Sequence, residues 1–475
     1  MFILALGGLS ACVSVPKIGN RTTMQTPESV AASQVLGPRG TLSWPVDRWW
    51  QTLGDQQLTA LIEEGLANAP QVAIAVARIQ RAEAEAQRVG AARQLSINAE
   101  AEAAMRRQSA NNGIPAQFLP SGWNDYAQTS FSLGYNFDVW GSNRAALAAA
   151  TSELRAATID AAQARLVLSV AITAAYAELG RAWRERDNAE DVLTNRRAMR
   201  DLVARRERNG LDSRSSLRQA DAEVASAQQA FAASEEIIDV RRNQISALLG
   251  AGPDRGRALM RPPLSPSAPA GIPAGVTTDL LGRRPDIVAA RERVESAASK
   301  LKLARAGFYP SISLRALIGL QALGIGNLSD SQSVYGAVGP AVSLPIFEGG
   351  ALQGQYRGAA ASYDEAAANY NQTVITAYQQ VADALAQRDA VDRRLAAARD
   401  ALSASKDALD MMRRRYEVGL ASYLDVLAAE RGVQTWQLAI IGLETNERGA
   451  ALAMVRALGG GFDVDTFSSA GQTGP

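Results

Sequence analysis

The sequence predicts a mainly α-helical chain with a small β part, organised as two similar halves. Two segments without internal proline, Ala145 to Arg208 and Ala351 to Glu417, are typical of continuous helices about 100 Å long. Four other segments, each of about ten residues, alternate apolar and polar side chains, as strands with two different faces do. Matching motifs recur in both halves, which indicates an internal repeat.

The composition of the 475 residues excludes several classes of protein. The chain has no histidine and one cysteine, which excludes histidine-based catalysis, histidine metal sites, a disulfide framework and a thiolate metal cage. Gly250 to Gly256 resembles a linker rather than a phosphate-binding loop, and no GxSxG motif is present. The net charge of +1 does not suggest a nucleic-acid partner. We therefore expect neither an enzyme nor a cofactor.

The N-terminus resembles a bacterial lipoprotein signal. Phe2 to Leu9 is an apolar run too short to span a bilayer, but suited to the core of a secretory signal. Leu9-Ser10-Ala11-Cys12 resembles a lipobox, in which cleavage precedes the cysteine and Cys12 carries lipid; the alternative is a buried thiol. Val13, rather than an aspartate, implies sorting to the outer membrane. Because no Lys or Arg precedes the apolar run, we expect the true start to lie upstream.

The two halves follow one plan, in which a helix leads into two strands, a very long helix and a returning helix. A segment rich in Pro, Gly and Ser separates the halves, as a linker does. The expected boundaries are a signal peptide 1–11, a lipidated extended segment 12–56, a first repeat 57–250 (helix Gln57 to Arg93, strands 95–105 and 129–139, helices Ala145 to Arg208 and Ser215 to Leu249), a linker 251–276, a second repeat 277–458 (helix Asp279 to Ala306, strands 311–320 and 334–344, helices Ala351 to Glu417 and Ser422 to Leu458) and a C-terminal tail 459–475.

The strand from Thr129 to Val139 shows the problem that the β part poses. Its apolar residues lie on one face and its polar residues on the other, and its length matches a strand that crosses a bilayer at a tilt. An open sheet leaves its edge amides unsatisfied in hydrocarbon, and outer-membrane barrels begin at eight strands. Either the sheet is a soluble layer packed on helices, or two or three copies share a barrel. The apolar face comprises Phe131, Leu133, Tyr135, Phe137 and Val139, and the polar face Ser130, Ser132, Asn136 and Asp138.

The chain resembles the outer membrane factors, the TolC-like channel components of tripartite efflux systems, and most closely their lipoprotein branch of the OprM/NodT type. The resemblance covers nearly the whole mature chain, and five motifs carry it in the order of the family. They are RWW (Arg48 to Trp50) with DQQLTALIEEGLANAP from Asp55, DLLGRRPDIVAARERVESAASKLKLARAGFYPSISL (Asp279 to Leu314), VSLPIFEGG (Val342 to Gly350), RYEVGLASYLDVLAAER (Arg415 to Arg431) and ALGGG (Ala457 to Gly461).

The resemblance implies a homotrimer, in which a twelve-stranded shared β-barrel forms the transmembrane β part and twelve helices form a periplasmic coiled-coil tunnel. It implies a passive exit duct for small molecules in the outer membrane, as part of a tripartite efflux system of the RND type. The implied partners are a periplasmic adaptor (membrane fusion) protein, an inner-membrane RND-type pump and outer membrane lipids. Two alternatives are the outer component of a type I protein secretion system, which has the same fold, and a periplasmic coiled-coil scaffold lipoprotein, which leaves the strands unexplained.

The turns after the two very long helices are expected to form the far tip of the tunnel. A glycine just past a helix end permits the left-handed conformation of a cap, and both turns have the pair Gly-Leu at this place. The resemblance implies that the tips dock the hairpin of the adaptor; the alternative is that the leucines only cover their own caps. The expected docking residues are Gly210, Leu211, Ser213, Gly419, Leu420 and Ser422.

Asp425 matches an acidic residue that lines the periplasmic aperture of TolC-like channels. In a trimer, three copies would face one axis, where like charges raise one another's pKa and attract cations. The match is partial, because Ala428 and Ala421 stand where the TolC pattern has Asp and Arg. Ser216 is the first-half counterpart of Asp425, so the resemblance implies fewer fixed charges than in TolC. The alternative is that Asp425 is a solvated helix residue.

Two charged segments have structural interpretations. Pro285 and Asp286 suit the first turn of a helix, with an ion pair from Asp286 to one of the two preceding arginines. Asp410 and the run Arg413 to Arg415 are expected to form a solvated helix face near the tip.

Trp140 and Phe347 follow strands at matching places in the two halves. Aromatic residues at the ends of membrane strands often form an interfacial belt. The alternative is that these two side chains pack between strand and helix.

Overall fold

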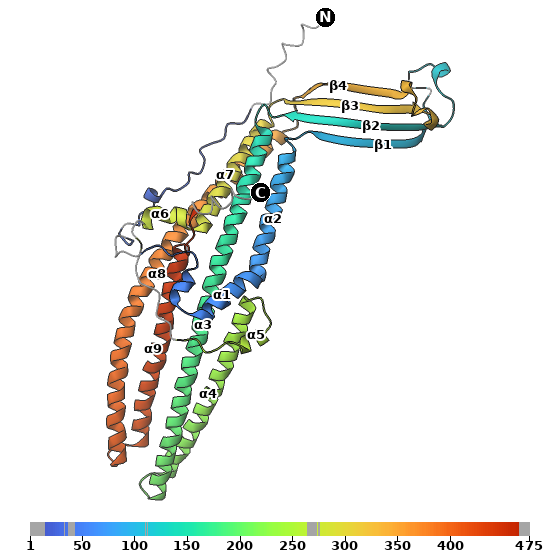
Figure 1. Cartoon of the computed structure of the whole chain (residues 1–475). Coiled ribbons are helices and arrows are strands. Elements are labelled where there is room, and N and C mark those ends of the chain that lie inside the picture. The colour runs from blue at the N-terminus through green and yellow to red at the C-terminus, as the bar shows by residue number, and fades with distance from the viewer. Residues whose placement is uncertain are drawn as a thin grey trace. The chain divides into compact units, whose positions relative to one another are not determined.

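A computed structural model describes residues 15–32, 34–36, 43–109, 111, 113–263, 273 and 276–464. The described chain is mainly helical, and its strands form a single antiparallel sheet (Figure 1). Its helices are α1 (Gln56–Asn68), α2 (Pro70–Ala91), α3 (Ser142–Arg208), α4 (Arg214–Leu248), α5 (Asp254–Arg257), α6 (Val276–Arg283), α7 (Pro285–Ala306), α8 (Ala351–Glu417) and α9 (Tyr423–Ala457), with short 3-10 turns that include η3 (Trp49–Leu53). Its strands are β1 (Ser96–Arg106), β2 (Asn124–Phe137), β3 (Ser311–Leu323) and β4 (Val334–Ser343).

The chain divides into two compact units, each assembled from separate segments. The sheet unit comprises Met1–Met24, Arg78–Ala157 and Ala290–Tyr370. The helical unit comprises Gln25–Ala77, Thr158–Ala289 and Asn371–Pro475.

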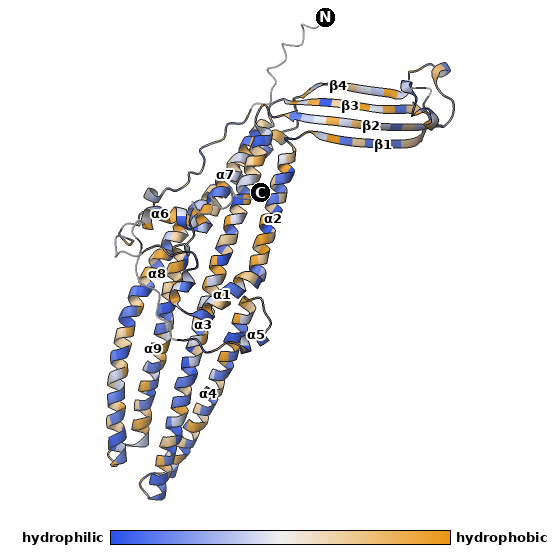
Figure 2. Ribbon diagram, viewed as in Figure 1, coloured by the Kyte–Doolittle hydropathy of each residue, from blue (hydrophilic) through white to orange (hydrophobic). Residues whose placement is uncertain are grey.

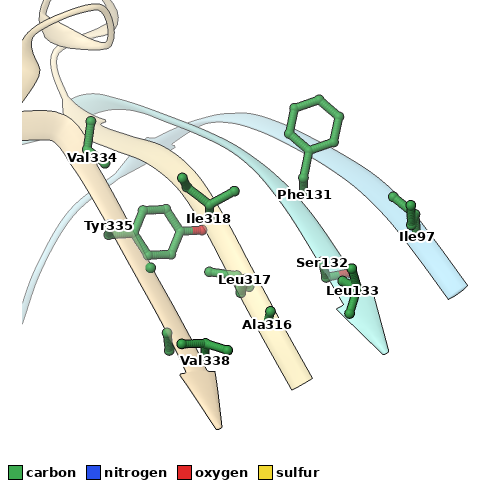
Figure 3. A pocket seen from close by; sticks show the side chains of 12 residues that line it. Ile97, Phe131, Ser132, Leu133, Ala316, Leu317, Ile318, Val334, Tyr335 and Val338 are labelled. Carbon is green, nitrogen blue, oxygen red and sulfur yellow. The ribbon is translucent and has the colours of Figure 1, made fainter. Parts of the chain in front are cut away.

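The sheet has the order β1-β2-β3-β4, and its register aligns the apolar residues of neighbouring strands. Phe131 of β2 lies opposite Ala99 of β1 and Ile318 of β3. On β4, Val338 lies opposite Ala316 of β3. Figure 3 shows Ile97, Phe131 and Ile318 on three adjacent strands, where they line a shallow apolar groove. Because side chains alternate between the two faces of a strand, this register makes one face of the sheet apolar from β1 to β4.

The opposite face of the sheet is polar. Asn98 of β1 lies opposite Ser132 of β2, and Gln128 donates a hydrogen bond of 2.6 Å to the Tyr335 hydroxyl. The polar face also carries Glu100 and Glu102 on β1. The two-faced strand that alternation predicts in β2 is therefore part of a two-faced sheet.

The strand boundaries differ from those that the sequence predicts, most of all in β2 and β3. β2 begins at Asn124 rather than Thr129, and ends at Phe137 rather than Val139. β3 extends to Leu323 rather than Leu320, where it still pairs with Tyr126. Gly122, two residues before β2, and Gly324, directly after β3, have positive φ, so the backbone turns just outside these strand ends.

Two helices that the sequence predicts as continuous are each divided before a proline. The helix expected from Gln57 to Arg93 is interrupted at Ala69, whose extended backbone separates α1 from α2 at Pro70. The helix expected from Asp279 to Ala306 is likewise divided, and the helix start expected at Pro285 is confirmed, because α7 begins at this residue. Proline lacks a backbone N–H and disfavours helical φ and ψ in the residue before it, so periodicity continues through these sites while the hydrogen bonding does not.

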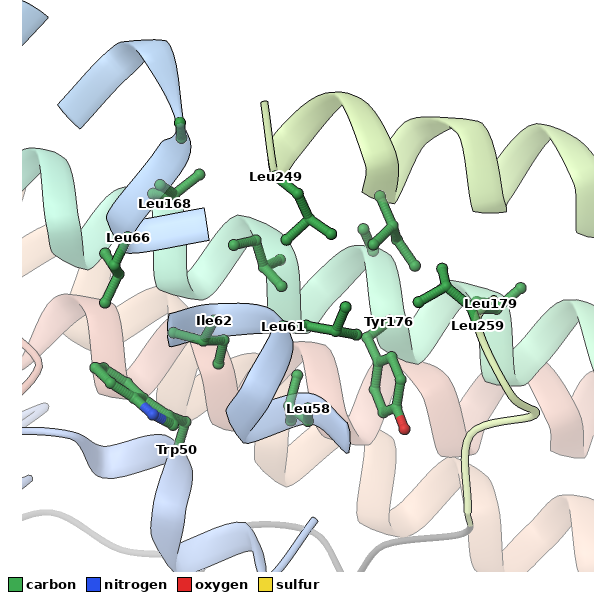
Figure 4. Close-up of a cluster of buried hydrophobic side chains, with 14 of the residues drawn as sticks. Trp50, Leu58, Leu61, Ile62, Leu66, Leu168, Tyr176, Leu179, Leu249 and Leu259 are labelled. Atoms are coloured by element: carbon green, nitrogen blue, oxygen red, sulfur yellow. The ribbon is translucent and has the colours of Figure 1, made fainter. Parts of the chain in front are cut away.

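The core of the helical unit forms where α1 packs against α3 (Figure 4). Leu61 and Ile62 of α1 are fully buried and contact a cluster that includes Leu168 and Leu179 of α3. Trp50 of η3 is buried at the same place. Asp55 caps α1 by accepting a hydrogen bond of 3.0 Å from the Leu58 amide. The residues of the motifs RWW and DQQLTALIEEGLANAP therefore have structural roles, as part of the core and as the N-cap of α1.

Outside this core, the long helices bury both large and small side chains, and a second cluster near their far ends includes Val203, Tyr416 and Leu427. Figure 2 shows polar and apolar residues interleaved along α3, α4, α8 and α9. Many of the fully buried positions are alanines, for example Ala156 on α3 and Ala367 and Ala377 on α8. Small side chains at these positions let the helix backbones approach one another closely.

The motif ALGGG ends α9 with a turn that only glycine fits. Gly459, Gly460 and Gly461 all have positive φ, and a Cβ on Gly459 would lie 1.9 Å from the carbonyl oxygen of Arg283. The preceding motif packs beside this turn: Arg284 is buried, donates to the Asp286 carboxylate, and donates a 3.0 Å hydrogen bond to the Ala457 carbonyl. The ion pair expected from Asp286 is confirmed with Arg284 as its partner. The hydrogen bond from Arg284 to Ala457 joins the start of α7 to the end of α9.

Substitution of Gly459→Ala is expected to destabilise the helical unit by about 2 kcal/mol or more, because the added Cβ meets backbone atoms and φ is positive. Denaturant unfolding of the purified chain measures this change. Gly358→Ala is the control, because a Cβ there has no atom within 4 Å and the site lies inside α8. The control should be neutral or slightly stabilising; an equal loss in both variants would contradict the close-approach explanation.

Candidate functional site at the helix tips

The turns after α3 and α8 have the same backbone geometry. Gly210 and Gly419 have φ of 71° and 82°. The Leu211 amide donates to the Arg206 carbonyl at 2.9 Å, and the Leu420 amide donates to the Arg415 carbonyl at 2.7 Å. These bonds, with those from the glycine amides, form the Schellman pattern that satisfies helix-end carbonyls. The left-handed glycine caps that the sequence predicts are therefore confirmed.

A serine starts the returning helix at each tip. The hydroxyl of Ser213 accepts a 3.0 Å hydrogen bond from the Ser216 amide at the start of α4. The hydroxyl of Ser422 accepts a 3.3 Å hydrogen bond from the Asp425 amide at the start of α9. Both serines are N-caps, so their hydroxyls are engaged in holding the turns.

The apolar side chains at the tips are exposed in this chain. Leu211 is 63% exposed and Leu420 is 70% exposed, so neither is covered by its own cap. Val418 and Leu424, which the sequence reasoning did not select, are also exposed. Together Leu211, Val418, Leu420 and Leu424 form an apolar tip surface.

Asp425 has a local structural role that sequence matching did not predict. Its carboxylate accepts hydrogen bonds of 2.8 Å from both the amide and the hydroxyl of Ser422, which completes a capping box. The hydrogen bond from the Ser422 amide is the main reason that the pKa of Asp425 lies below its ordinary value. The carboxylate is therefore charged at neutral pH, and its contribution to the cap is lost only as the pH falls through this lowered pKa. Ser216, its first-half counterpart, has no carboxylate to do this.

Asp212 connects the two helical hairpins. Its Oδ2 atom accepts a 2.6 Å hydrogen bond from the Tyr416 hydroxyl and a 3.0 Å bond from Arg206 Nε. Arg206 also donates to the Glu417 carbonyl at 3.1 Å and lies over the Tyr416 ring. Burial is the main reason that the pKa of Tyr416 is raised, so its hydroxyl stays protonated and available as a donor. The available signal was the repeat alignment, in which Asp212 stands opposite Ala421.

A buried ion-pair network lies further along the same helices. Arg196 of α3 and Glu430 of α9 form a direct ion pair, with side chains only 5% and 8% exposed. Glu430 also accepts a 2.9 Å hydrogen bond from Arg413 of α8, and Glu223 of α4 pairs with Arg431 at 2.7 Å. The solvated face expected near the tip is confirmed for Asp410, Arg414 and Arg415, which are exposed. It is wrong for Arg413, which is only partly exposed and pairs with the buried Glu430.

The two strand-exit aromatics have different environments. Trp140 stacks on Tyr309 with ring centroids 4.7 Å apart, and its Nε1 donates to the Pro310 carbonyl at 2.8 Å. Phe347 is 84% exposed. Trp140 therefore packs on Tyr309 but stays half exposed, so an interfacial position remains open to it, whereas Phe347 has no such packing among the described residues. Cys12 lies outside the described residues.

Comparisons with known proteins identify the family. The family model described as outer membrane efflux protein matches residues 61–251 and 276–460. The chain belongs to the outer membrane efflux protein family. Among solved structures, this efflux protein is similar to the outer membrane protein VceC from Vibrio cholerae, with 39% identity, a TM-score of 0.82, and coverage of 88% of this chain and 100% of that chain.

Two further relatives have names that refer to resistance. The efflux protein is 34% identical to the fusaric acid resistance protein FusA of Burkholderia cepacia over 327 residues, which cover 67% of this chain and 60% of the relative. It is 27% identical to the multidrug resistance outer membrane protein MdtP of Escherichia coli K12 over 474 residues, which cover 96% and 94% of the two chains. The efflux protein is thus an outer membrane transport protein. Its family consists of channels, which are not enzymes and which work with efflux pumps.

Substitution of Glu430→Gln is expected to lower the free energy of unfolding by about 3 kcal/mol, because it removes the direct charged partner of the buried Arg196 and leaves only Glu223 at 3.9 Å. Denaturant unfolding of the purified chain measures the loss. The control is Glu190→Gln, whose carboxylate is 52% exposed in its pair with Arg186 and should change stability by less than about 1 kcal/mol. Equal effects of the two substitutions would show that the network is not effectively buried.

Proposed function

We propose that three copies of this efflux protein form a closed twelve-stranded barrel in the outer membrane and a twelve-helix tunnel in the periplasm. The observation that carries the proposal is the sheet register, which gives four strands one apolar and one polar face. β1 and β4 are edge strands of this sheet. Their unpaired backbone groups would cost several kcal/mol each in hydrocarbon, so a membrane location requires partner strands from other copies.

In this arrangement the apolar face contacts lipid and the polar face lines a wet lumen. Phe131, Ile318 and Val338 would face acyl chains, and Asn98, Glu100 and Glu102 would face water. The alternation fits the inside-outside pattern of membrane barrels. The similarity to the outer membrane protein VceC over the whole of that chain supports the same arrangement.

The channel is proposed to be a passive exit duct of a tripartite system, joined to a periplasmic adaptor and an inner-membrane pump of the RND type. Small molecules are the proposed cargo, because the names of FusA and MdtP refer to resistance to fusaric acid and to multiple drugs. Lipid on Cys12 is the proposed anchor. A protein secretion system is the competing role, and loss of drug resistance without loss of protein export in a deletion strain would decide against it.

Substitution of Phe131→Lys is expected to reduce the amount of assembled trimer in the outer membrane, because a lysine facing lipid costs about 2–4 kcal/mol per chain at mid-bilayer. The control is Asn98→Lys on the polar face of the neighbouring strand, which should assemble normally and change ion preference only. Native mass spectrometry of detergent extracts and planar-bilayer conductance measure both effects. Equal assembly of the two variants, or a stable monomer in the wild type, would rule out the shared barrel.

The aperture role of Asp425 is proposed on its exposure and charge. Asp425→Asn keeps an acceptor for the Ser422 amide but removes the charge, so it should weaken the cation preference of trimers in planar bilayers without unfolding α9. Asp410→Asn, at an exposed aspartate of α8, is the control and should leave the preference unchanged. An unchanged reversal potential in Asp425→Asn would exclude a narrow aperture at this residue.

The exposed tip leucines are proposed to contact the adaptor, with Gly210, Gly419, Ser213 and Ser422 holding the turns. Leu211→Asp and Leu420→Asp should each weaken co-purification of a co-expressed adaptor at least about tenfold, because each removes a buried leucine contact. Val240→Asp, at an exposed apolar residue of α4 away from the tip, is the control. Undiminished adaptor recovery with both leucine variants would place docking elsewhere.

A further inference from the structure

A groove of about 580 Å³ in the sheet unit lies between the start of α3 and the end of α7. It is directly beside the ends of two strands, because Trp140 follows β2 and Tyr309 precedes β3. β2 and β3 are the central strands of the sheet. The groove is therefore distant in the sheet order from β1 and β4, where other copies of the chain would join.

Two aromatic rings form one wall of this groove. Trp140 and Tyr309 are stacked, with an interplanar angle of 18°, and the hydrogen bond from Trp140 to Pro310 fixes the indole ring. Both side chains nevertheless remain partly exposed, at 49% and 36%. Rigid amphipathic rings at the ends of membrane strands suit the level of lipid headgroups.

Three cationic side chains line the same groove, and two of them are uncompensated. Arg144 pairs with Asp138 at 3.2 Å. Lys302 and Arg305 are exposed, and within the described ranges of the chain no carboxylate pairs with either. Lys302 and Arg305 are three residues apart on α7, so they share one helix face, and Tyr309 lies three residues after the end of that helix. The groove thus presents two available positive charges next to the aromatic wall.

The N-terminal segment reaches the same end of α7. Val15 and Ile18 pack with Leu301 against Ala304 and Phe308, directly beside the cationic residues in sequence. Cys12, the proposed lipidation site, precedes Val15 by three residues. Val15 and Ile18, which follow the proposed lipidation site in sequence, therefore pack on the same end of α7 that lines the groove.

We propose that this groove binds the phosphate of an anionic phospholipid headgroup in the periplasmic leaflet. Lys302 and Arg305 donate to the phosphate oxygens, and Trp140 and Tyr309 contact the glycerol region. A bilayer lipid fits better than free phosphate, because the groove combines cations with an aromatic wall at the edge of an apolar sheet face. The inference rests on the proposed membrane location of the sheet, and goes beyond it by naming a headgroup site.

Native mass spectrometry of the full chain in detergent, titrated with phosphatidylglycerol or phosphatidylethanolamine, tests the site. The wild type should retain phosphatidylglycerol preferentially. Lys302→Gln and Arg305→Gln should each lower this retention about fivefold, the effect of removing one cation near a lipid surface. Lys300→Gln, at an exposed lysine of the same helix outside the groove, is the matched control and should retain the lipid.

Three results would overturn the site. They are equal retention of the two lipids by the wild type, an equal loss in Lys300→Gln, and displacement of phosphatidylglycerol by inorganic phosphate at the same concentration. Planar-bilayer conductance of the same preparations separates this inference from the channel proposal. Normal conductance without headgroup preference would remove the lipid site alone, whereas absence of conductance would remove the channel.

Discussion

The unpaired edges of the sheet are the constraint on which the rest of the molecule depends. Every second residue of an edge strand directs its backbone N–H and C=O groups away from the sheet, and hydrocarbon offers these groups no partner. The described sheet has one predominantly apolar face, which water would not favour, and two edges without a paired strand, which lipid would not tolerate. The sheet of a single copy is therefore unfavourable both in water and in the hydrocarbon of a bilayer. The association of copies proposed above would resolve both conditions at once, because strands of other copies would pair with the edges while lipid covers the apolar face.

The repeated halves are alike in backbone and different in charge. Both tips have a glycine cap and a serine N-cap, but only the second has a carboxylate that completes the capping box, at Asp425. Conversely, only the first has an acidic turn residue, Asp212, which holds Tyr416 of the other hairpin. The two halves thus have the same backbone turns. Asp212, which has no acidic counterpart in the second half, couples the two hairpins, and Asp425 stabilises only its own helix start.

Features that depend on local backbone chemistry could be predicted from the sequence. Strand starts at Ser311 and Val334 follow from alternation, and the caps at Gly210 and Gly419 follow from the need for positive φ. Periodicity alone did not reveal the break at Pro70, because apolar spacing continues on both sides of it. Contacts between helices that are distant in sequence could not be predicted either. Arg196 and Glu430 are 234 residues apart, and the sequence around each residue does not indicate that the other is its partner.

The connection between the two central strands has a consequence for folding. β2 belongs to the first half and β3 to the second, and Gln128 bonds to Tyr335 from 207 residues away. Contacts between residues so far apart in sequence slow folding, since a large loop must be closed before they form. During synthesis, the hairpin of β1 and β2 exists before its neighbour does and exposes an apolar face and a bare edge. Such an intermediate is prone to aggregation, so we expect the nascent chain to require a periplasmic chaperone until the second half has been exported.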